Sequence, residues 1–245
     1  MREDMSEIAS TIAIDGPAAS GKSTVGALVA QALGYIYFDT GVMYRAVTWV
    51  ALQRGIPIAD EDAVTRLAET LPIEVVKPTV DDGRQYTVYA GDEDVTWDLR
   101  RAETNQNVSP VSAYAGVRRA LVAQQRRIAQ QGQIVMVGRD IGTVVLPEAE
   151  CKVYLDADVA ERSLRRYREV VARRVGQSYT DVTVAASTDD EEYAQIHADM
   201  MRRDQIDSSR AVAPLRAAED ATVIDTSPLS VAQVVERVLA LARND

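Results

Sequence analysis

Residues 11–24 read TIAIDGPAASGKST, and this stretch decides the fold. Its first five residues, up to Asp15, are typical of a buried strand. Residues 16–23 fit the pattern G-x-x-x-x-G-K-[ST], which forms a phosphate-binding loop where it joins a strand to a helix. Apolar residues then recur at helical spacing as far as Leu33, and Gly34 stands where that helix would end. The stretch therefore predicts a strand, a phosphate-binding loop and a helix in succession.

The residue types in this loop point to a nucleotide and a metal ion. Glycines at its two ends permit backbone conformations that turn N–H groups toward a phosphate. Lys22 brings a charge near the β- and γ-phosphates, and the Ser23 hydroxyl is expected to ligate Mg²⁺, supported by either Asp15 or Asp140. We therefore predict ATP and Mg²⁺ as cofactors. The expected ATP contacts in this stretch are Gly16, Pro17, Ala18, Ala19, Ser20, Gly21, Lys22, Ser23 and Thr24.

Four more short apolar segments follow the first: Tyr35–Asp39, Ile134–Val137, Lys152–Asp156 and Thr222–Asp225. They are apolar throughout rather than alternating, which is typical of parallel strands covered on both faces. Helical patterns separate most of them, and two of these helices have start signals, Asp158 with Glu161 and Ser230 with Gln233. The sequence predicts an α/β fold with a doubly wound, five-stranded parallel sheet.

Two stretches do not fit this core. Residues 57–98 contain apolar–polar alternation around a glycine turn, which predicts a β-hairpin in an inserted subdomain. Residues 163–202 are polar and charged, with Gly176 and the acidic run Asp189–Glu192, and we expect a mobile helical lid. The first ten residues have no apolar signal region and are expected to form a disordered leader. The prediction is one domain over residues 11–245, with a core of 11–56, 132–162 and 203–245, an insert of about 57–131 and a lid of about 163–202.

Composition excludes several classes of function. The net charge of −10 argues against a general nucleic-acid-binding protein, although 24 of the 27 basic residues are arginines, which suit phosphate binding. No apolar run approaches the roughly 20 residues that cross a bilayer. The single cysteine, Cys151, cannot form an intramolecular disulfide and is expected to be buried in a strand, and with the single histidine, His197, it cannot build a zinc site. We expect a cytoplasmic monomer without nucleic-acid or membrane partners.

Polar residues follow the second and third predicted strands, where ligands bind in open α/β sheets. DTGVMYR, residues 39–45, offers the Thr40 hydroxyl and the Arg45 guanidinium to an acceptor phosphate. GRD, residues 138–140, offers Arg139 to the same phosphate, and Asp140 can accept a hydrogen bond from the exocyclic N4 amine of cytosine. The alternatives are a solvated Arg45 on a helix surface and a structural ion pair between Arg139 and Asp140.

Several stretches together resemble the bacterial cytidylate kinases, relatives of adenylate kinase, along nearly the whole chain: IDGPAASGKST, DTGVMYRA, VSAYAGVR, GRDIGTVVLP, KVYLDA and RDQIDSSRAVAPL. The resemblance implies a P-loop nucleoside monophosphate kinase. Such an enzyme transfers the γ-phosphoryl group of ATP to CMP or dCMP and gives ADP with CDP or dCDP. The region of the expected hairpin is similar to the family's CMP-binding insert.

The resemblance also implies roles for individual residues. Ser109 and Arg118 would contact the base, Arg203 and Asp207 the sugar, and Arg210 the phosphates. Among Arg162, Arg165 and Arg166 of the lid, Arg162 and Arg166 would contact ATP. The alternatives are a surface charge at Arg118, as at Arg119, Arg126 and Arg127, and a plain salt bridge between Arg203 and Asp207 at i, i+4 spacing. The full acceptor site would be Thr40, Tyr44, Arg45, Ser109, Arg118, Arg139, Asp140, Arg203, Asp207 and Arg210.

Phosphoryl transfer needs alignment and charge neutralisation rather than covalent help from the protein. We expect Lys22, Arg45, Arg139 and Arg210 to be the catalytic residues that surround the transferred group, with no general base. Uracil would set its O4 acceptor against Asp140, which favours CMP over UMP. The rival readings are a kinase of UMP, AMP or shikimate type and a P-loop switch. The switch is disfavoured because the chain contains neither Asn-Lys nor Asp-x-x-Gly.

Overall fold

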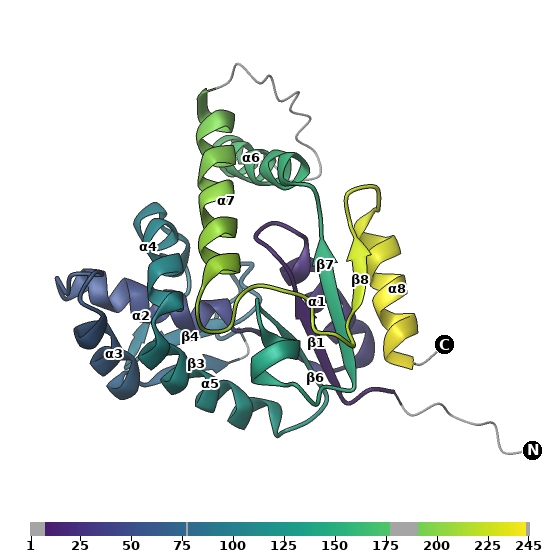
Figure 1. The fold of residues 1–245 in the computed structure, drawn as a ribbon, viewed down its shortest axis with the longest axis horizontal. Coiled ribbons are helices and arrows are strands. Elements are labelled where there is room, and N and C mark those ends of the chain that lie inside the picture. The colour runs from purple at the N-terminus through teal and green to yellow at the C-terminus, as the bar shows by residue number, and fades with distance from the viewer. Residues whose placement is uncertain (1–7, 77, 177–190, 244–245) are drawn as a thin grey trace, which may run out of the picture.

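The computed structural model describes residues 8–76, 78–176 and 191–243. Its centre is a sheet of five parallel strands in the order β2-β6-β1-β7-β8 (Figure 1). The five predicted strands are confirmed, with β2 beginning one residue later and β7 one residue earlier than expected. Their bounds are β1 Thr11–Asp15, β2 Ile36–Asp39, β6 Ile134–Val137, β7 Cys151–Asp156 and β8 Thr222–Asp225.

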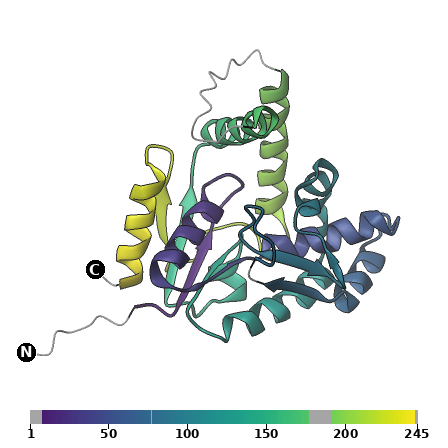
Figure 2. The same cartoon turned by 180° about the vertical axis from the view of Figure 1, so that it is seen from behind.

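The two faces of the sheet pack into two separate cores, which is why the central strands carry apolar residues on both faces. On β1, Ile12 and Ile14 pack into the core beneath α1 (Lys22–Leu33) and α8 (Val231–Arg243). Ala13, which lies between them, faces the other core together with Met136 of β6. The helices α1 and α8 lie side by side over the first face (Figure 2). Cys151 is buried, as expected.

The ends of the helices follow the sequence signals in most cases. Gly34 adopts the left-handed conformation at φ 71° and ends α1. At the start of α8, Gln233 N–H donates to Ser230 Oγ at 3.3 Å, and the Gln233 side chain accepts from Ser230 N–H at 2.9 Å. Asp158 caps α6 (Val159–Val175) by accepting from Ala160 N–H at 2.8 Å, whereas Glu161 pairs with Arg165.

The second core extends into the inserted elements. These elements include a small antiparallel sheet in the order β3-β4-β5, where the hairpin was predicted. Val88 of β4 and Leu121 of α5 share one apolar cluster with Met136 of the central sheet, so the insert is packed continuously with it. The helix α2 Gly41–Gln53 precedes the insert. The inserted elements are α3 Glu61–Thr70, β3 Ile73–Val76, β4 Thr87–Ala90, β5 Glu93–Asp94, the 3₁₀ turn η1 Asp98–Arg100, α4 Ala102–Ala113 and α5 Ala115–Ala129.

The region expected to form the lid is helical where it is described. The helices α6 and α7 (Glu191–Ser209) pack against each other and project from the rest of the molecule (Figure 1). Of the acidic run, Asp189 and Asp190 lie outside the described residues, and Glu191 and Glu192 begin α7.

The amino-terminal stretch joins the core before Thr11. Residues 1–7 of the expected leader lie outside the described residues. Ala9 is buried and its N–H donates to the Ala242 carbonyl at 2.8 Å, while the Ser10 carbonyl accepts from Ile134 N–H at 3.0 Å. The packed part of the chain therefore begins at these residues, earlier than the sequence suggested.

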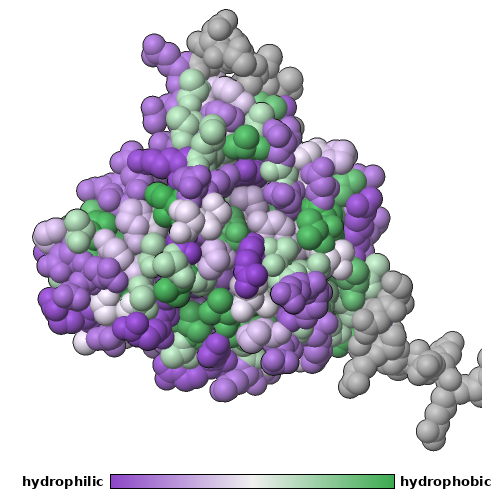
Figure 3. Space-filling model, in the orientation of Figure 1, coloured by the Kyte–Doolittle hydropathy of each residue, from purple (hydrophilic) through white to green (hydrophobic). Residues whose placement is uncertain are grey.

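The face of the molecule shown in Figure 3 is largely hydrophilic. On the face shown in Figure 3, hydrophobic residues form small separate patches among polar ones. Within the described residues, no helix is both long enough and apolar enough to span a membrane.

Three loops that leave the carboxyl ends of neighbouring parallel strands position the candidate site. The phosphate-binding loop follows β1, Thr40 follows β2, and Gly138–Asp140 follows β6. A single turn of π-helix, η2 (Ile141–Val145), comes directly after Asp140. Because β2, β6 and β1 are adjacent in the sheet, their loops meet at one edge.

Candidate active site

The phosphate-binding loop has the tight backbone that its glycines predict. Gly16 has φ +145°, and a Cβ atom there would lie 2.0 Å from the Leu155 carbonyl oxygen. Gly21 has φ +96°, and Ala19 is also in the left-handed region at φ 56°. The Lys22 ammonium group turns into the loop and donates to the Pro17 carbonyl at 2.5 Å. Burial, together with the charge of Arg139, lowers the pKa of Lys22 well below its usual value. A bound phosphate would offset both effects.

The carboxylate beside Ser23 is Asp39, at the end of β2. Ser23 Oγ donates to Asp39 Oδ2 at 3.2 Å, and Asp39 Oδ1 accepts from Gly41 N–H at 3.0 Å. The two carboxylates named from the sequence are engaged elsewhere, Asp15 with backbone N–H groups and Asp140 with an arginine. Asp39 was not among the residues predicted from the sequence, although its position at the head of DTGVMYR was a usable signal.

These residues fit Mg²⁺ bound mainly through a nucleotide. No group of three or more His, Cys, Asp or Glu side chains that could hold a metal occurs among the residues the structure describes. Mg²⁺ keeps several waters and binds through one or two protein oxygens plus phosphates. A hydroxyl and a carboxylate at the mouth of a phosphate-binding loop match that pattern.

A buried ion pair marks the acceptor side. The Arg118 guanidinium on α5 pairs with the Asp140 carboxylate, and the two side chains are 3% and 6% exposed. Arg118 also donates to the Ser112 carbonyl at 3.1 Å, and its Cζ lies 5.5 Å from the centre of the Tyr44 ring. The alternative reading of Arg118 as a surface charge is therefore wrong. The alternative pair of Arg139 with Asp140 is also wrong, because Asp140 pairs with Arg118.

Arg139 instead reaches α7. Its Nε donates to Asp207 Oδ2 at 3.0 Å, so Asp207 does not form the local i, i+4 salt bridge with Arg203 that was an alternative reading. Arg203 Nε is buried without a hydrogen-bond partner. Arg210 donates one N–H to the Ser112 carbonyl at 3.4 Å, while its Nε and Nη2 are buried and unpartnered.

Positive charges gather around these residues. Burial, together with the guanidinium groups of Arg203, Arg166 and Arg100, lowers the pKa of Arg45 to about 9. Burial and the charge of Arg139 lower the pKa of Arg203 to about 10. These lowered pKa values mean that keeping the arginines charged costs free energy in the folded chain. A bound anion would offset that cost. We call Arg45, Arg118, Arg139, Arg203 and Arg210 the arginine cluster.

Comparison with known proteins shows the family of the chain. The sequence model described as cytidylate kinase matches residues 12–244, which is almost the whole chain. The chain belongs to the cytidylate kinase family. A protein named cytidylate kinase from Herpetosiphon aurantiacus is 48% identical over 94% of this chain and 93% of its own length. A protein of the same name from Chloroflexus aggregans is 53% identical over 74% of this chain and 78% of its own length. Another from Lactiplantibacillus plantarum is 45% identical over 96% of this chain and 95% of its own length.

Other residues predicted for the acceptor site of this cytidylate kinase family member have structural contacts of their own. The Thr40 hydroxyl donates its only proton to the Val137 carbonyl at 3.0 Å and so joins the end of β2 to β6. That proton is therefore not available for a hydrogen bond to a phosphate. Tyr44 lies beneath Arg118, and its hydroxyl is buried and unpartnered. Ser109 is buried on α4, on the same helix as the Ser112 carbonyl that binds Arg118 and Arg210.

The three arginines at the start of α6 differ from one another. Arg162 donates to the Ala18 carbonyl of the phosphate-binding loop at 3.3 Å and pairs with Asp204 of α7 at 2.6 Å. Arg165 binds Thr226 and Glu161 and is structural. Arg166 is one-third exposed and pairs with Glu169 of its own helix. In this cytidylate kinase family member, Arg162 thus links the phosphate-binding loop to α6 and α7.

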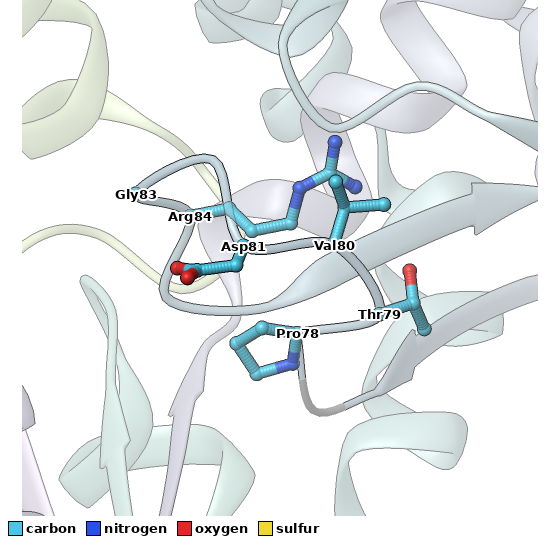
Figure 4. Close-up of a pocket in the computed structure, with 6 residues that line it drawn as sticks. All are labelled: Pro78, Thr79, Val80, Asp81, Gly83 and Arg84. Atoms are coloured by element: carbon cyan, nitrogen blue, oxygen red, sulfur yellow. The ribbon is translucent and has the colours of Figure 1, made fainter.

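Two surface hollows lie away from the arginine cluster. One, of about 330 Å³, is formed by the loop between β3 and β4 (Figure 4). Its arginine, Arg84, is already paired with Asp82 and Asp94, so it is not available to an anion. The other, of about 640 Å³, lies beside Glu191 and Gln195 at the start of α7. Neither contains the residues of the site.

Proposed function

We propose that this chain transfers the γ-phosphoryl group of ATP to CMP or dCMP, giving ADP and CDP or dCDP. One observation carries the proposal. Buried guanidinium nitrogens of Arg118, Arg203 and Arg210 have no partner, beside the buried pair of Arg118 with Asp140. Unpaired buried donors are costly, and a nucleotide that brings phosphate and base acceptors to them offsets that cost.

ATP and Mg²⁺ bind at the phosphate-binding loop in this proposal. Backbone N–H groups of residues 16–21 and the N-terminus of α1 hold the phosphates, and Lys22 neutralises charge at the β- and γ-positions. Ser23 and Asp39 would hold Mg²⁺, which would supply neutralisation of phosphate charge. Arg162 and Arg166 approach ATP from α6, and the contact of Arg162 with Ala18 supports its part.

The base of the acceptor is read at the pair of Arg118 and Asp140. Asp140 accepts from the N4 amine of cytosine, and Arg118 donates to the O2 and N3 edge. The direct ion pair between the two side chains therefore separates when the base binds. Uracil would present O4 to the carboxylate and leave two acceptors facing each other. A site built to bind a donor rejects a ligand without it by on the order of 10⁴-fold. Ser109, Tyr44 and Asp207 complete the base and sugar contacts.

The transferred group travels between Lys22 and the arginine cluster. Arg45, Arg139 and Arg210 neutralise the acceptor phosphate and the developing charge, which is the main demand of the reaction. No general base is needed, because the acceptor phosphate is an oxyanion at neutral pH. We assign acceptor binding to the insert, about residues 57–131, and exclusion of water to the lid, about residues 163–202.

An acceptor screen tests the proposal. ADP release is followed with Mg²⁺–ATP and, in turn, CMP, dCMP, UMP, AMP, shikimate or no acceptor, and the product is identified by chromatography. Lys22→Met, which removes the loop's ammonium group, is the control for contaminating kinase. We expect rapid release with CMP or dCMP, slow release with UMP, and background with the others. Preferred turnover of AMP, UMP or shikimate would contradict the acceptor assignment.

The same proposal places the enzyme in the cytoplasm as a monomer with nucleotides as its partners. ATP and CMP are cytoplasmic, and a buried reduced thiol at Cys151 suits a reducing compartment. Light scattering of the purified protein at micromolar concentration tests the monomer; a mass of twice 26.8 kDa would contradict it.

A further inference from the structure

The π-helical turn η2 is bound at both of its ends by side chains distant in sequence. At its start, the Asp15 carboxylate accepts from Ile141 N–H and from Gly142 N–H, each at 2.7 Å. At its end, Arg126 Nε donates to the Val145 carbonyl at 3.0 Å, and its Nη2 donates to the Val144 carbonyl at 2.7 Å. A negative charge therefore faces the N–H end of the turn and a positive charge faces the carbonyl end, the arrangement that a helical dipole favours.

The π-helical turn η2 fixes the position of the Asp140 backbone. The Asp140 carbonyl accepts from Val144 N–H at 2.9 Å and from Val145 N–H at 3.1 Å. The next peptide N–H, that of Ile141, is the one that Asp15 holds. The backbone on the C-terminal side of Asp140 is thus fixed to η2, and η2 is fixed to Asp15 and Arg126.

Arg126 and Arg118 belong to the same helix. Both lie on α5, two turns apart, and they bind η2 and Asp140 respectively. The distance between the Arg118 guanidinium and the Asp140 carboxylate therefore depends on how η2 sits against α5. Arg126 is exposed, as a surface charge would be, and its guanidinium in addition holds the two carbonyls at the end of η2.

We propose that Asp15 and Arg126 are positioning residues that hold η2 and thereby keep the Asp140 carboxylate in register with Arg118 for base recognition. The inference rests on the proposed function, because it concerns the acceptor base. The proposed function assigns neither residue a contact with the acceptor nucleotide. Arg126 gives the cleaner test, because Asp15 directly precedes the phosphate-binding loop and also faces Lys22.

The test compares Arg126→Met, Arg126→Lys and the matched control Arg127→Met, an exposed neighbour on the same helix. For Arg126→Met we expect KM for CMP to rise about tenfold, the ratio of kcat/KM for CMP over UMP to fall about tenfold, and KM for ATP to change by less than twofold. Arg126→Lys, which can still donate to a carbonyl, should recover part of both losses. Arg127→Met should match the parent enzyme.

A second readout does not depend on activity. Amide hydrogen exchange at residues 141–145 should become at least about tenfold faster in Arg126→Met and remain unchanged in Arg127→Met. If Arg126 had a purely structural role, Arg126→Met would lower the melting temperature. The CMP-to-UMP ratio and the KM values for CMP and ATP would then stay unchanged, or the two KM values would rise together. Either result overturns the inference. If the parent enzyme prefers another acceptor, the CMP proposal fails, and the same comparison with that acceptor still decides the role of Arg126.

Discussion

Arg118 and Asp140 form an ion pair that is almost completely shielded from water, although they come from a helix of the insert and from the loop after β6. Burying two charges is costly, and the pair is kept by the additional hydrogen bond to the Ser112 carbonyl and the ring of Tyr44. The pair places one donor fork and one carboxylate side by side. That arrangement matches the acceptor and donor groups on the edge of cytosine.

Arg139 should be essential for turnover. It is the guanidinium group whose charge is felt by both Lys22 and Arg203, between the phosphate-binding loop and the rest of the cluster. Arg139→Met should lower kcat by about 10²–10³ at saturating ATP and CMP. Arg202→Met, on the exposed face of α7, is the matched control and should be unaffected. A near-normal kcat for Arg139→Met would remove Arg139 from the catalytic set.

Arg210 should stabilise the complex with nucleotide, whereas in the free protein its buried charge should not add to stability. Two of its buried nitrogens have no partner, and burial lowers its pKa. Arg210→Met should therefore leave the melting temperature of the free protein unchanged or higher, because replacing a buried charge with an apolar chain of similar volume is often neutral or stabilising. The rise in melting temperature on adding CMP should disappear. A lower melting temperature with normal stabilisation by CMP would assign Arg210 to the fold alone.

Asp39 should set the Mg²⁺ requirement. Asp39→Asn keeps an oxygen for Gly41 N–H but removes the charge beside Ser23. We expect the Mg²⁺ concentration for half-maximal rate at fixed ATP to rise about tenfold, with the CMP-to-UMP preference intact. Asp39→Asn with an unaltered Mg²⁺ titration would mean that the metal is held by the nucleotide and Ser23 alone.

Asp15 should make stability depend on pH. Burial raises its pKa from 3.8 to about 6, despite the two backbone N–H groups that favour the ionised form. The native state then binds this proton more tightly than the unfolded state, so the stability it contributes is full below about pH 4 and is lost as the pH rises through about 6. Relative to Asp15→Asn, the free energy of unfolding should fall by about 1 kcal/mol between pH 5 and pH 7. Urea titrations measure this, and a difference that stays constant or grows would be inconsistent with it.

Local patterns were sufficient for the strands and most helix ends. All five strands of the central sheet are short apolar runs, and Gly34, Ser230 and Gln233 act through neighbours within a few residues. Signals of this kind are contained in a short window of sequence. The predicted fold class follows from their order along the chain.

Side-chain contacts between elements that are distant in sequence could not be predicted from local patterns. Asp15 was a possible Mg²⁺ ligand by position, but it binds Ile141 and Gly142, more than a hundred residues away. Arg139 pairs with Asp207 across the site, although the spacing of Asp207 from Arg203 suggested a local pair. Spacing shows which side chains share a helix face. It does not show which other element presents a better partner.

The ratio of kcat/KM for CMP over UMP, in the parent enzyme and in Asp140→Asn, tests the central claim most directly. If the Asp140 carboxylate accepts from the cytosine amine, the ratio is large in the parent and falls by about 10–100-fold in Asp140→Asn, whose amide also offers a donor to uracil O4, while KM for ATP is retained. An equal ratio in the two proteins, with Asp140→Asn folded and binding ATP, would show that the base is read elsewhere.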